Sequence, residues 1–416
     1  MKIWLITVGE PLPIESGQPR LLRTGILADL LARRGHQVTW WTSAFDHFRK
    51  RFHSPGNRAI EVRTGLSLRL LDGCGYRTNV SVARLVNHWQ IARQFRLQAR
   101  AEARPDLVLC SLPTIELCVE AVRYGQSESA PVVLDIRDFW PDVFSEVIPA
   151  PLRPLSRLAL LPMVRAVDEA CRGASAIIGI TAPFVSWGLR HAGRAATEFD
   201  RDFPFGYVHE QPPTEAVDAA RNGWHAWGVH DTAFIVCFFG TVGRHFDLET
   251  VIEAAGMLRS RCPDMKLVLC GDGDRLTHYQ ELAKAAPNVQ FPGRIEFPSI
   301  WTLMRIASAG LAPYRNARNF ALNIPNKIIE YLSAGLPIVS SLEGEVRTLL
   351  SQYNCGLTYE SATGLVEALC RLYDDAPLRS TLAGNAKVVF REKFVADKVY
   401  GSLSEHLEAL SARYHQ

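Results

Sequence analysis

The sequence lacks any run of about 18 apolar residues, the length that a membrane-spanning helix needs. Its start, MKIWLITVGEPLPIESG, has neither the basic beginning nor the long apolar stretch of a secretory leader, so we expect a cytoplasmic protein. No C-x-x-C pair occurs, and the nine cysteines have mostly apolar neighbours, which predicts reduced core residues. Neither a P-loop nor the dinucleotide pattern G-x-G-x-x-G is present, which excludes two common phosphate-binding loops.

The composition is that of an ordinary folded protein, with 47% hydrophobic and 21% charged residues, and 416 residues are enough for two domains. The net charge of +3 is uneven, because residues 1–104 contain 17 Lys and Arg against 7 Asp and Glu. The arginines whose spacing predicts one helix face are Arg93, Arg96, Arg100 and Arg104. They fit a solvated helix face or a surface attracted to anionic lipid or an anionic acceptor. Nucleic acid is not an expected partner, because no DNA- or RNA-binding motif accompanies them.

Short apolar segments alternate with helical patterns along most of the chain, which predicts an α/β fold with parallel sheets. The expected strands are residues 2–8, 37–42, 107–111, 132–135 and 176–180, then 234–239, 266–270, 289–291, 310–312 and 337–340. The two series predict two Rossmann-like domains, at 1–200 and 201–390, joined by the Pro-, Gly- and charge-rich stretch 199–214. Residues 391–416 are helical by pattern and either finish the second domain or cross back to the first.

The segment NIPNKIIEYLSAGLPIV, residues 323–339, carries the strongest chemical signal. A proline near the first turn of the helix, after an asparagine able to cap it, exposes backbone N–H groups and the positive end of the helix dipole. Lys327 adds a full charge, and Glu330 follows one turn later, where it is able to accept hydrogen bonds from a ribose diol. An ordinary capped helix explains the apolar residues of this segment but not the Lys/Glu spacing.

Other polar segments also follow expected strands, where open parallel sheets bind ligands. Gly240–Arg244 comes after an apolar strand, so its glycines would let the backbone approach a diphosphate and Arg244 would neutralise charge on it. Turn geometry alone also explains such glycines. The D-x-D segments 200–202 and 272–274 are a metal-binding pattern, but one lies in the linker and the other in a glycine turn, so no metal is expected. Arg137 and Asp138 follow the strand at 132–135 and have a local ion pair as their structural explanation.

Taken together, these segments resemble the retaining glycosyltransferases of family 4, which have the GT-B fold. The resemblance covers nearly the whole chain and rests on LADLLARRGHQVTWWTS, DIRDFWPD, FFGTVGRHFDLETVIEAA, LVLCGDGD, NVQFPGRI and IPNKIIEYLSAGLPIV. Within this family, the sequence most resembles bacterial transferases that build surface polysaccharides on lipid carriers, including O-antigen N-acetylfucosamine transferases. The resemblance implies two Rossmann-like domains that face each other across a cleft, with the donor on the second and the acceptor on the first.

The resemblance also implies roles for particular residues. Glu330 matches the second acid of the family's E-x7-E motif, expected on the ribose, and Arg244 with Gly243 matches the segment expected on the diphosphate. Asp138 falls at the position of an acceptor-side aspartate. The remaining positions implied in donor binding are Gly17, Arg294, Ile295, Asn323, Ile324, Pro325 and Asn326.

Three departures from the family pattern bear on these roles. Leu322 stands where the first acid of E-x7-E is usual. Phe246 or Asp247 stands where a lysine usually follows the arginine, and we expect Lys327 to supply that charge. On the acceptor side, Arg137 replaces a histidine and Ser16 replaces a glycine.

The reaction expected from the resemblance is transfer of a sugar, such as an N-acetylated hexosamine, from a UDP-sugar to a lipid-linked or saccharide acceptor, with no cofactor. Arg244, Lys327 and the helix start would stabilise the leaving diphosphate without a metal, with Asp138 as acceptor-orienting base. The expected location is the cytoplasm, at the inner face of the membrane if the basic front half binds lipid. A nucleotide-sugar epimerase of similar architecture and a non-catalytic sugar-binding or scaffold protein stay open as alternatives.

Overall fold

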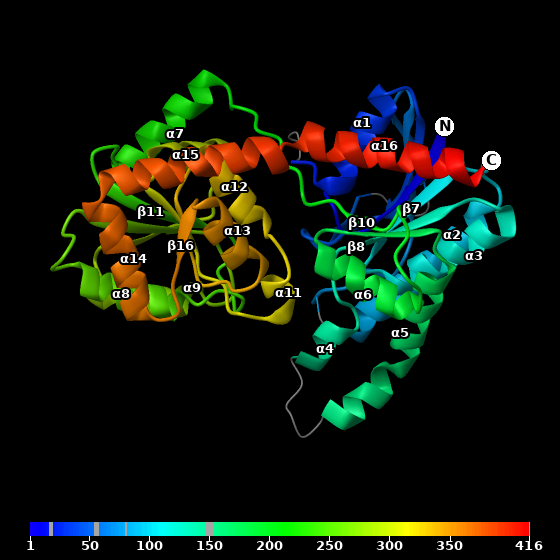
Figure 1. The fold of residues 1–416 in the computed structure, drawn as a ribbon, viewed down its shortest axis with the longest axis horizontal. Helices are drawn as coiled ribbons and strands as arrows, with labels where there is room; N and C mark the ends of the chain where they lie inside the picture. Colours follow the sequence, from blue (N-terminus) through cyan, green and yellow to red (C-terminus); the bar gives the residue numbers. More distant parts are fainter. Residues whose placement is uncertain (16–19, 54–57, 80, 147–152, 416) are drawn as a thin grey trace. The chain divides into compact units, whose positions relative to one another are not determined.

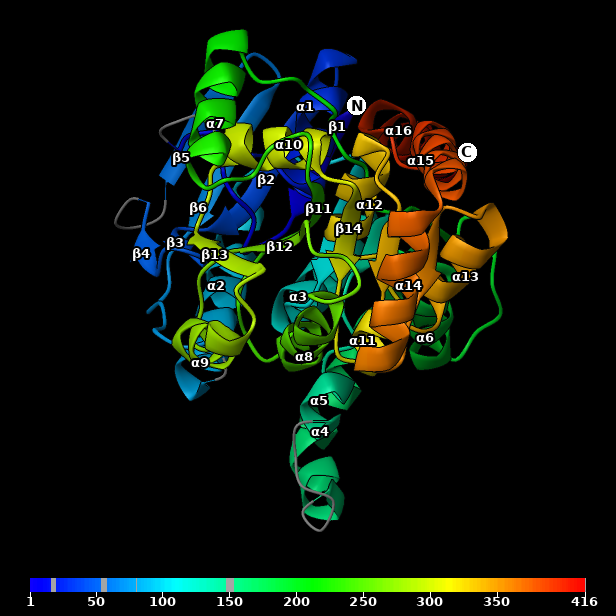
Figure 2. The same cartoon turned by 90° about the vertical axis from the view of Figure 1, so that its left-hand side faces the viewer.

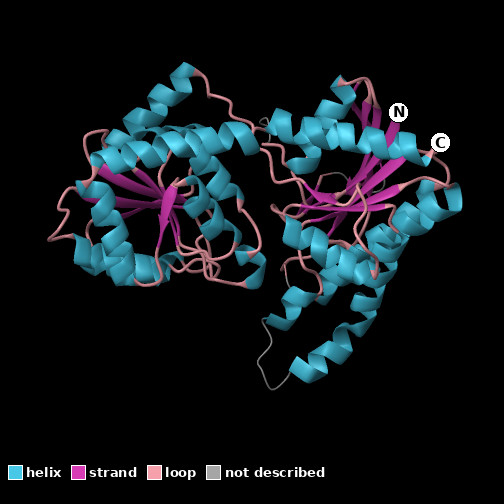
Figure 3. Ribbon diagram, viewed as in Figure 1, coloured by secondary structure: helices cyan, strands magenta, loops and turns pink. Residues whose placement is uncertain are grey.

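The computed structural model describes residues 1–15, 20–53, 58–79, 81–146 and 153–415. The chain forms two compact units, one made of Met1–Gly206 with Ala396–Gln416 and the other of Tyr207–Val395. In each unit a sheet forms the central layer and helices cover both of its faces (Figure 3). The predicted α/β class with two Rossmann-like domains is confirmed.

The sheet of the first unit has the strand order β10-β9-β8-β7-β1-β2-β6-β5. Its strands are parallel except β5, which pairs antiparallel with β6. Every residue of β7 and β8 is buried, as expected for inner strands covered on both faces. The strands are β1 (Lys2–Ile6), β2 (Gln37–Ser43), β5 (Arg58–Arg63), β6 (Leu66–Leu71), β7 (Leu107–Leu112), β8 (Val132–Ile136), β9 (Ala176–Gly179) and β10 (Arg201–Asp202), with a separate hairpin of β3 (Phe45–Asp46) and β4 (Arg51–Phe52).

The helices of the first unit include the last helix of the chain, α16, which lies beside α1 (Figure 1). Leu403 and Leu407 of α16 are fully buried in the same core as Leu27 and Leu31 of α1. The backbone N–H of Gly206 donates to the Tyr400 hydroxyl at 3.0 Å. The helices are α1 (Arg23–Arg33), α2 (Val82–Ala99), α3 (Ile115–Glu128), α4 (Asp142–Glu146), α5 (Arg153–Gly173), α6 (Ala182–Ala192) and α16 (Ala396–Tyr414).

Two sequence predictions, one on an arginine face and one on the cysteines, are wrong in detail. Helix α2 ends at Ala99 with Arg100 as its C-cap, and the Arg104 guanidinium donates to the Ser129 carbonyl instead, so Arg104 is not on the arginine face of this helix. All nine cysteines are free, but Cys74 is exposed while the other eight are buried. Within the described residues, no helix is long and apolar enough to cross a membrane.

The sheet of the second unit is wholly parallel, with the strand order β13-β12-β11-β14-β15-β16. This is the doubly wound order, in which the direction of winding reverses between β11 and β14. Ligands of such sheets bind at that switch point, outside the carboxyl ends of the strands. The strands are β11 (Phe234–Phe239), β12 (Met265–Cys270), β13 (Val289–Gly293), β14 (Ala309–Ala312), β15 (Ile338–Ser340) and β16 (Gly356–Thr358).

Helices cover both faces of the second sheet, and α7 lies beside α10 in the view of Figure 2. Trp224 of α7 is buried, and its indole N–H donates to the Ser299 carbonyl of α10 at 3.0 Å. The helices are α7 (Thr214–Ala226), α8 (Leu248–Leu258), α9 (Leu276–Leu282), the 3-10 turn η2 (Ala283–Ala285), α10 (Phe297–Ile306), α11 (Arg318–Ala321), α12 (Asn326–Ala334), α13 (Glu345–Tyr353), α14 (Ala362–Asp374) and α15 (Ala376–Lys393).

The stretch expected to be a linker, residues 199–214, is partly built into the first unit. Arg201 and Asp202 form β10 and pair in parallel with β9. The Asp200 carboxylate accepts from the backbone N–H of Ile177 and from the Arg194 guanidinium, both at 2.7 Å. The Pro-, Gly- and charge-rich stretch therefore belongs to the edge of the first sheet, rather than to a linker, as far as Gly206, where the first unit ends.

Candidate functional site

The loops that follow β11 and β12 of the second sheet each begin with a glycine, and these two glycines are in backbone contact. Gly240 and Gly271 follow β11 and β12 directly and adopt φ values of 153° and 148°. A Cβ atom on Gly271 would lie 1.8 Å from the carbonyl oxygen of Gly240. The backbone of Gly240 donates to Cys270 at 3.0 Å, and that of Val242 donates to Asp272 at 2.9 Å. The two loops thus extend the sheet by backbone contact, which leaves no room for side chains between them.

The Lys327 side chain lies in a box of aromatic rings at this switch point. Its Nζ atom is 4.5 Å from the ring centroid of Phe238, 4.6 Å from that of Phe239 and 5.6 Å from that of Phe246. The position of a Cβ atom on Gly240 would be only 2.9 Å from this Nζ. Ring faces attract a cation at such distances, so the box holds the ammonium against the backbone at the end of β11.

Burial makes this ammonium costly to keep charged. Lys327 is 7% exposed, and burial lowers its pKa to about 8, although the nearby Glu330 carboxylate opposes the shift. Glu330 lies one turn further along α12 and is 6% exposed. At neutral pH most copies of Lys327 are therefore charged inside a largely apolar box, a state that an approaching anion would stabilise.

The start of α12 differs from the prediction in its cap. The helix begins at Asn326, as predicted, but the N-cap position is Pro325, whose side chain cannot accept a hydrogen bond from the first turn. The Oδ1 atom of Asn323 is buried and has no hydrogen-bond partner in the part of the chain that the structure describes. The asparagine cap was therefore wrong, and the first turn of α12, reached through Ile324, keeps uncapped N–H groups next to Lys327.

The other residues predicted for donor binding lie on the loops that follow β11 and β13. Arg244 and Arg294 are exposed, and neither has an ion-pair partner among the residues described. Gly243 is buried, with its Cβ position 3.4 Å from the Asp274 carboxylate, and Ile295 is half-buried. The carboxyl ends of parallel strands meet at one edge of the sheet, so both arginines are on the edge where Lys327 lies.

The acceptor-side predictions belong to the first unit. Asp138 follows β8 and accepts a hydrogen bond from the backbone N–H of Phe139 at 2.8 Å. The Arg137 guanidinium does not pair with it but with Asp135 at 2.7 Å and with Glu10. Arg23 and Arg137 keep the pKa of the fully buried Asp135 low, although burial would raise it. Gly17, together with Ser16, is outside the described residues.

One acidic residue of each D-x-D segment has hydrogen-bond partners within the protein, and a different group of described residues brings possible metal ligands together. Asp272 accepts from the backbone N–H of Gly273, and Asp200 is used by the contacts of the β10 segment. Glu15, Asp46 and His53 bring possible ligand atoms within 4.8 Å of one another. Both carboxylates of that set are already close to the Arg49 guanidinium, at 2.9 and 4.0 Å.

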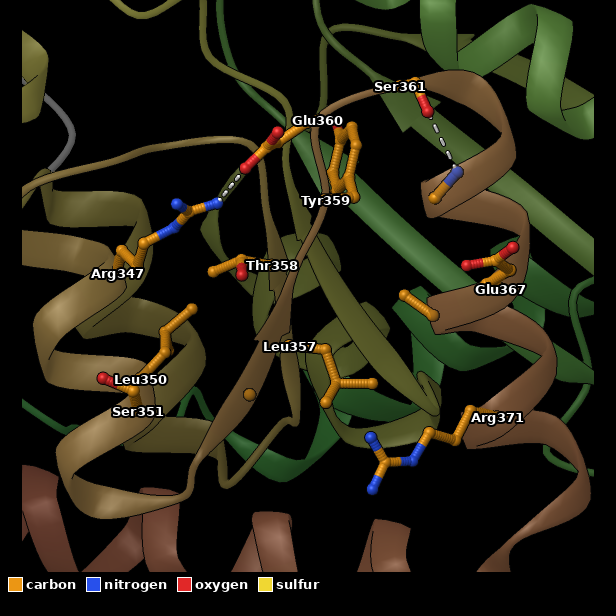
Figure 4. A pocket seen from close by; sticks show the side chains of 13 residues that line it. Arg347, Leu350, Ser351, Leu357, Thr358, Tyr359, Glu360, Ser361, Glu367 and Arg371 are labelled. Atoms are coloured by element: carbon orange, nitrogen blue, oxygen red, sulfur yellow. Dashed lines mark hydrogen bonds and ion pairs between the residues drawn. The ribbon is translucent and has the colours of Figure 1, made fainter.

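A separate cavity of about 640 Å³ lies along the edge strand β16, between α13 and α14 (Figure 4). Arg347 and Glu360 pair across one end of it at 2.6 Å, and Arg371 extends toward the other end. None of the predicted site residues lines this cavity. It is at the side edge of the sheet, away from the switch point between β11 and β14.

Sequence reasoning missed the aromatic box. The Phe238–Phe239 pair was indistinguishable from core residues of a buried strand, and Phe246 was noted only as a departure from the family pattern. The bridge between Phe246 and Tyr314, whose ring centroids are 4.6 Å apart, joins the segments that follow β11 and β14. Phe246 stands where the family usually has a lysine. Its ring contacts the ammonium of Lys327, the residue that we expected to supply the charge of that missing lysine.

In a comparison with known families, residues 233–375 match the model of the family "Glycosyl transferases group 1". The phosphatidyl-myo-inositol mannosyltransferase of Mycolicibacterium smegmatis is 23% identical over 141 residues, which are 33% of this chain and 36% of that protein. The chain thus aligns with only about a third of the length of this curated relative.

Solved structures resemble the chain over nearly its whole length. Sucrose-phosphate synthase from Thermosynechococcus elongatus has a TM-score of 0.71 at 18% identity, with 99% of each chain covered. The Anabaena protein HepE, solved in complex with UDP, has a TM-score of 0.67 at 15% identity and covers 98% of this chain and 100% of its own. The fold is therefore the GT-B fold that the family resemblance implied.

Proposed function

We propose that this chain is a retaining glycosyltransferase that moves a sugar from a UDP-sugar to a lipid-linked saccharide in bacterial surface polysaccharide synthesis. The observation that carries the proposal is the buried Lys327 ammonium at the switch point, beside the Gly240 backbone and the uncapped start of α12. The ammonium and the helix start are two sources of positive potential at one sheet edge, which suits a diphosphate. The group 1 glycosyltransferase match over residues 233–375 and the UDP bound by HepE support the same donor class.

In the proposed reaction the bond between the sugar C1 atom and the UDP oxygen breaks, and C1 bonds to an acceptor hydroxyl oxygen on the same face. The acceptor proton passes to the departing diphosphate oxygen, so atoms and charge balance without a protein nucleophile. Lys327, Arg244 and the N–H groups of α12 stabilise the negative charge as it develops on the diphosphate. Arg294 and Ile295 contact the base, and Asp138 orients the acceptor. No metal is required.

Replacing Glu330 by glutamine tests the ribose contact. We expect wild-type protein to bind UDP about 10-fold more tightly than 2′,3′-dideoxy-UDP, because a carboxylate gains about 1.5–3 kcal/mol from charge-assisted hydrogen bonds. Glu330→Gln should weaken UDP and leave the dideoxy analogue nearly unchanged, as measured by titration calorimetry. Glu281→Gln, which changes an exposed glutamate that pairs with Lys284, is the matched control. A Glu330→Gln variant that still prefers UDP by 10-fold would contradict the assignment.

The proposal includes contact with an anionic membrane through the exposed face of α2. Val82 is 76% and Trp89 is 59% exposed, and Arg93, Arg96 and Arg100 continue that face at helical spacing. Aromatic and apolar side chains next to arginines suit the interface of a bilayer with negative lipids.

This contact predicts that the protein sediments with vesicles of phosphatidylcholine and 30% phosphatidylglycerol at about 50 mM salt, and far less at about 500 mM. Trp89→Glu should reduce the bound fraction at least several-fold, because it places a negative charge at the interface. Met257→Glu, which alters a 42% exposed side chain of the second unit, should bind like wild type. Absence of sedimentation at low salt would contradict the proposal.

A further inference from the structure

A second group of cations and aromatic rings lies in the first unit, at the carboxyl side of its sheet. His47 follows β3, Tyr76 follows β6, Trp140 follows β8, and Arg84 is in the first turn of α2. The Nδ1 atom of His47 is 2.6 Å from the Tyr76 hydroxyl. The Lys50 ammonium is 4.7 Å from the Tyr76 ring centroid, so the group is one continuous cluster.

Arg84 is the centre of this cluster. Its guanidinium carbon is 5.7 Å from the Tyr76 ring centroid and 4.6 Å from that of Trp140. One of its terminal nitrogens donates to the Asn79 carbonyl at 2.9 Å, but its Nε atom is buried without a hydrogen-bond partner among the described residues. The Nδ1 atom of His88, a residue only 2% exposed whose ring is 5.8 Å from that of Trp140, lies 3.9 Å from the Glu116 carboxylate. Buried donors without acceptors are rare and costly, so the Arg84 Nε atom lacks an acceptor group, whereas the Lys50 ammonium donates to the side-chain oxygen of Asn79.

The positive charge of the cluster is not balanced. Within the described residues no carboxylate forms an ion pair with Lys50 or Arg84, although Asp46 and Asp138 are near enough to act on them. The Asp46 carboxylate already accepts from the backbone N–H groups of Phe48 and Arg49. Burial, and then repulsion from Lys50 and Arg84, lower the pKa of His47 to about 4. A bound anion would relieve this repulsion.

We infer that Lys50, Tyr76 and Arg84, with His47 beside Tyr76, form a phosphate-binding site that holds the phosphate group of the acceptor. An arginine fork, an ammonium and a hydroxyl are the donors that recognise phosphate oxygens. This inference rests on the proposed function in one respect: the proposed function assigns the acceptor to the first unit. Its ligand is a phosphate or diphosphate ester, carried by a polyprenyl lipid or by a soluble sugar.

The neighbouring surface favours the lipid source. Phe48, next to His47, is 61% exposed, and Phe52, whose ring contacts that of Phe45 beside Tyr76, is 42% exposed. Apolar side chains of this kind would accompany a phosphate that is attached to a hydrocarbon chain at a membrane surface.

The test is titration calorimetry of full-length protein with farnesyl diphosphate, in excess UDP so that the donor unit is occupied. Wild type should bind farnesyl diphosphate but not farnesol, and Lys50→Gln and Arg84→Gln should each weaken binding at least 10-fold. Arg33→Gln, which removes an exposed arginine of α1, should stay within about twofold of wild type. Lys50 is partly exposed, so Lys50→Gln stays informative if Arg84→Gln proves unstable.

Each outcome of this test bears on the inference. Unchanged affinity in both variants would overturn it. Inorganic pyrophosphate that binds as tightly as farnesyl diphosphate, with the same loss in the variants, would support the phosphate site and assign it to a soluble acceptor. Binding of UDP is measured separately: if wild type does not bind UDP, the proposed donor fails, while the two variants still decide whether the phosphate site exists.

Discussion

Replacing Lys327 by methionine should lower UDP affinity by about 10- to 100-fold without lowering stability. The loss follows from removal of a charge next to the diphosphate, since a charge-assisted hydrogen bond contributes about 1.5–3 kcal/mol. Stability should rise by up to about 3 kcal/mol at pH 7, because each unit of pKa depression corresponds to about 1.4 kcal/mol of penalty on the charged form. Calorimetry gives the first quantity and urea unfolding gives the second.

The pH dependence of stability and of UDP affinity gives a further test of the Lys327→Met variant. Burial lowers the folded-state pKa of Lys327 to about 8, below its ordinary value of 10.5. The destabilisation of the folded protein by the buried Lys327 charge is therefore fully present below pH 8. It fades as the pH rises from 8 toward 10.5, the ordinary pKa of lysine. UDP affinity of the wild type should decline above pH 8 as the ammonium loses its proton, and Lys327→Met should lack that decline.

The matched control is Lys284→Met, which removes an exposed lysine of the second unit that is paired with Glu281. It should leave both UDP affinity and the free energy of unfolding close to those of wild type, because surface ion pairs contribute little. A Lys327→Met variant that binds UDP as tightly as this control would contradict the role of the ammonium.

Replacing Gly271 by alanine should destabilise the protein by about 3 kcal/mol or more, or prevent it from folding. The added methyl group would overlap the Gly240 carbonyl oxygen, at 1.8 Å, and the residue would keep an unfavourable φ of 148°. The neighbour is backbone at the end of a central strand, so it cannot move without separating β11 from β12. Urea unfolding, or the yield of soluble protein, measures the effect.

Gly256→Ala is the matched control for this glycine. Gly256 lies within α8, and among the described residues no atom outside its chain neighbours and the backbone of this helix is within 4 Å of its Cβ position. The substitution should stabilise the protein by about 0.5–1 kcal/mol, because alanine favours a helix more than glycine does. Equal stability of the Gly271→Ala and Gly256→Ala variants would show that the two loops are not packed as described.

The fold was largely predictable from the sequence because its strands are short, fully apolar and buried on both faces. Phe234–Phe239 and Asn326–Ala334 begin and end where the pattern placed them. The strands β5 and β6 were missed because the prediction relied on fully apolar segments, whereas RAIEVR and LSLRLL mix charged or polar residues with apolar ones, as half-buried strands do. The two-residue strand β10 was missed for a different reason: two residues carry no periodic signal.

The site was predictable only where its residues share one segment. Lys327 and Glu330 were found because they are one turn apart on a single helix. The aromatic box depends on the return of the chain after β11, which brings Phe246 back to Phe238 with ring centroids 4.9 Å apart. The cluster around Arg84 joins residues from four separate loops or helix ends, and no spacing in the sequence predicts that they meet. Arg137 pairs with Asp135 rather than Asp138 because Asp135 is fully buried and also contacts Arg23.

The central claim, that the switch point of the second sheet holds a nucleoside diphosphate without a metal, is tested most directly by calorimetry with UDP, GDP, ADP and CMP, each with and without EDTA. We expect UDP to bind at least about 10-fold more tightly than the other nucleotides, with the same affinity when EDTA is present. Binding of no nucleotide, or loss of UDP binding in EDTA, would contradict the account.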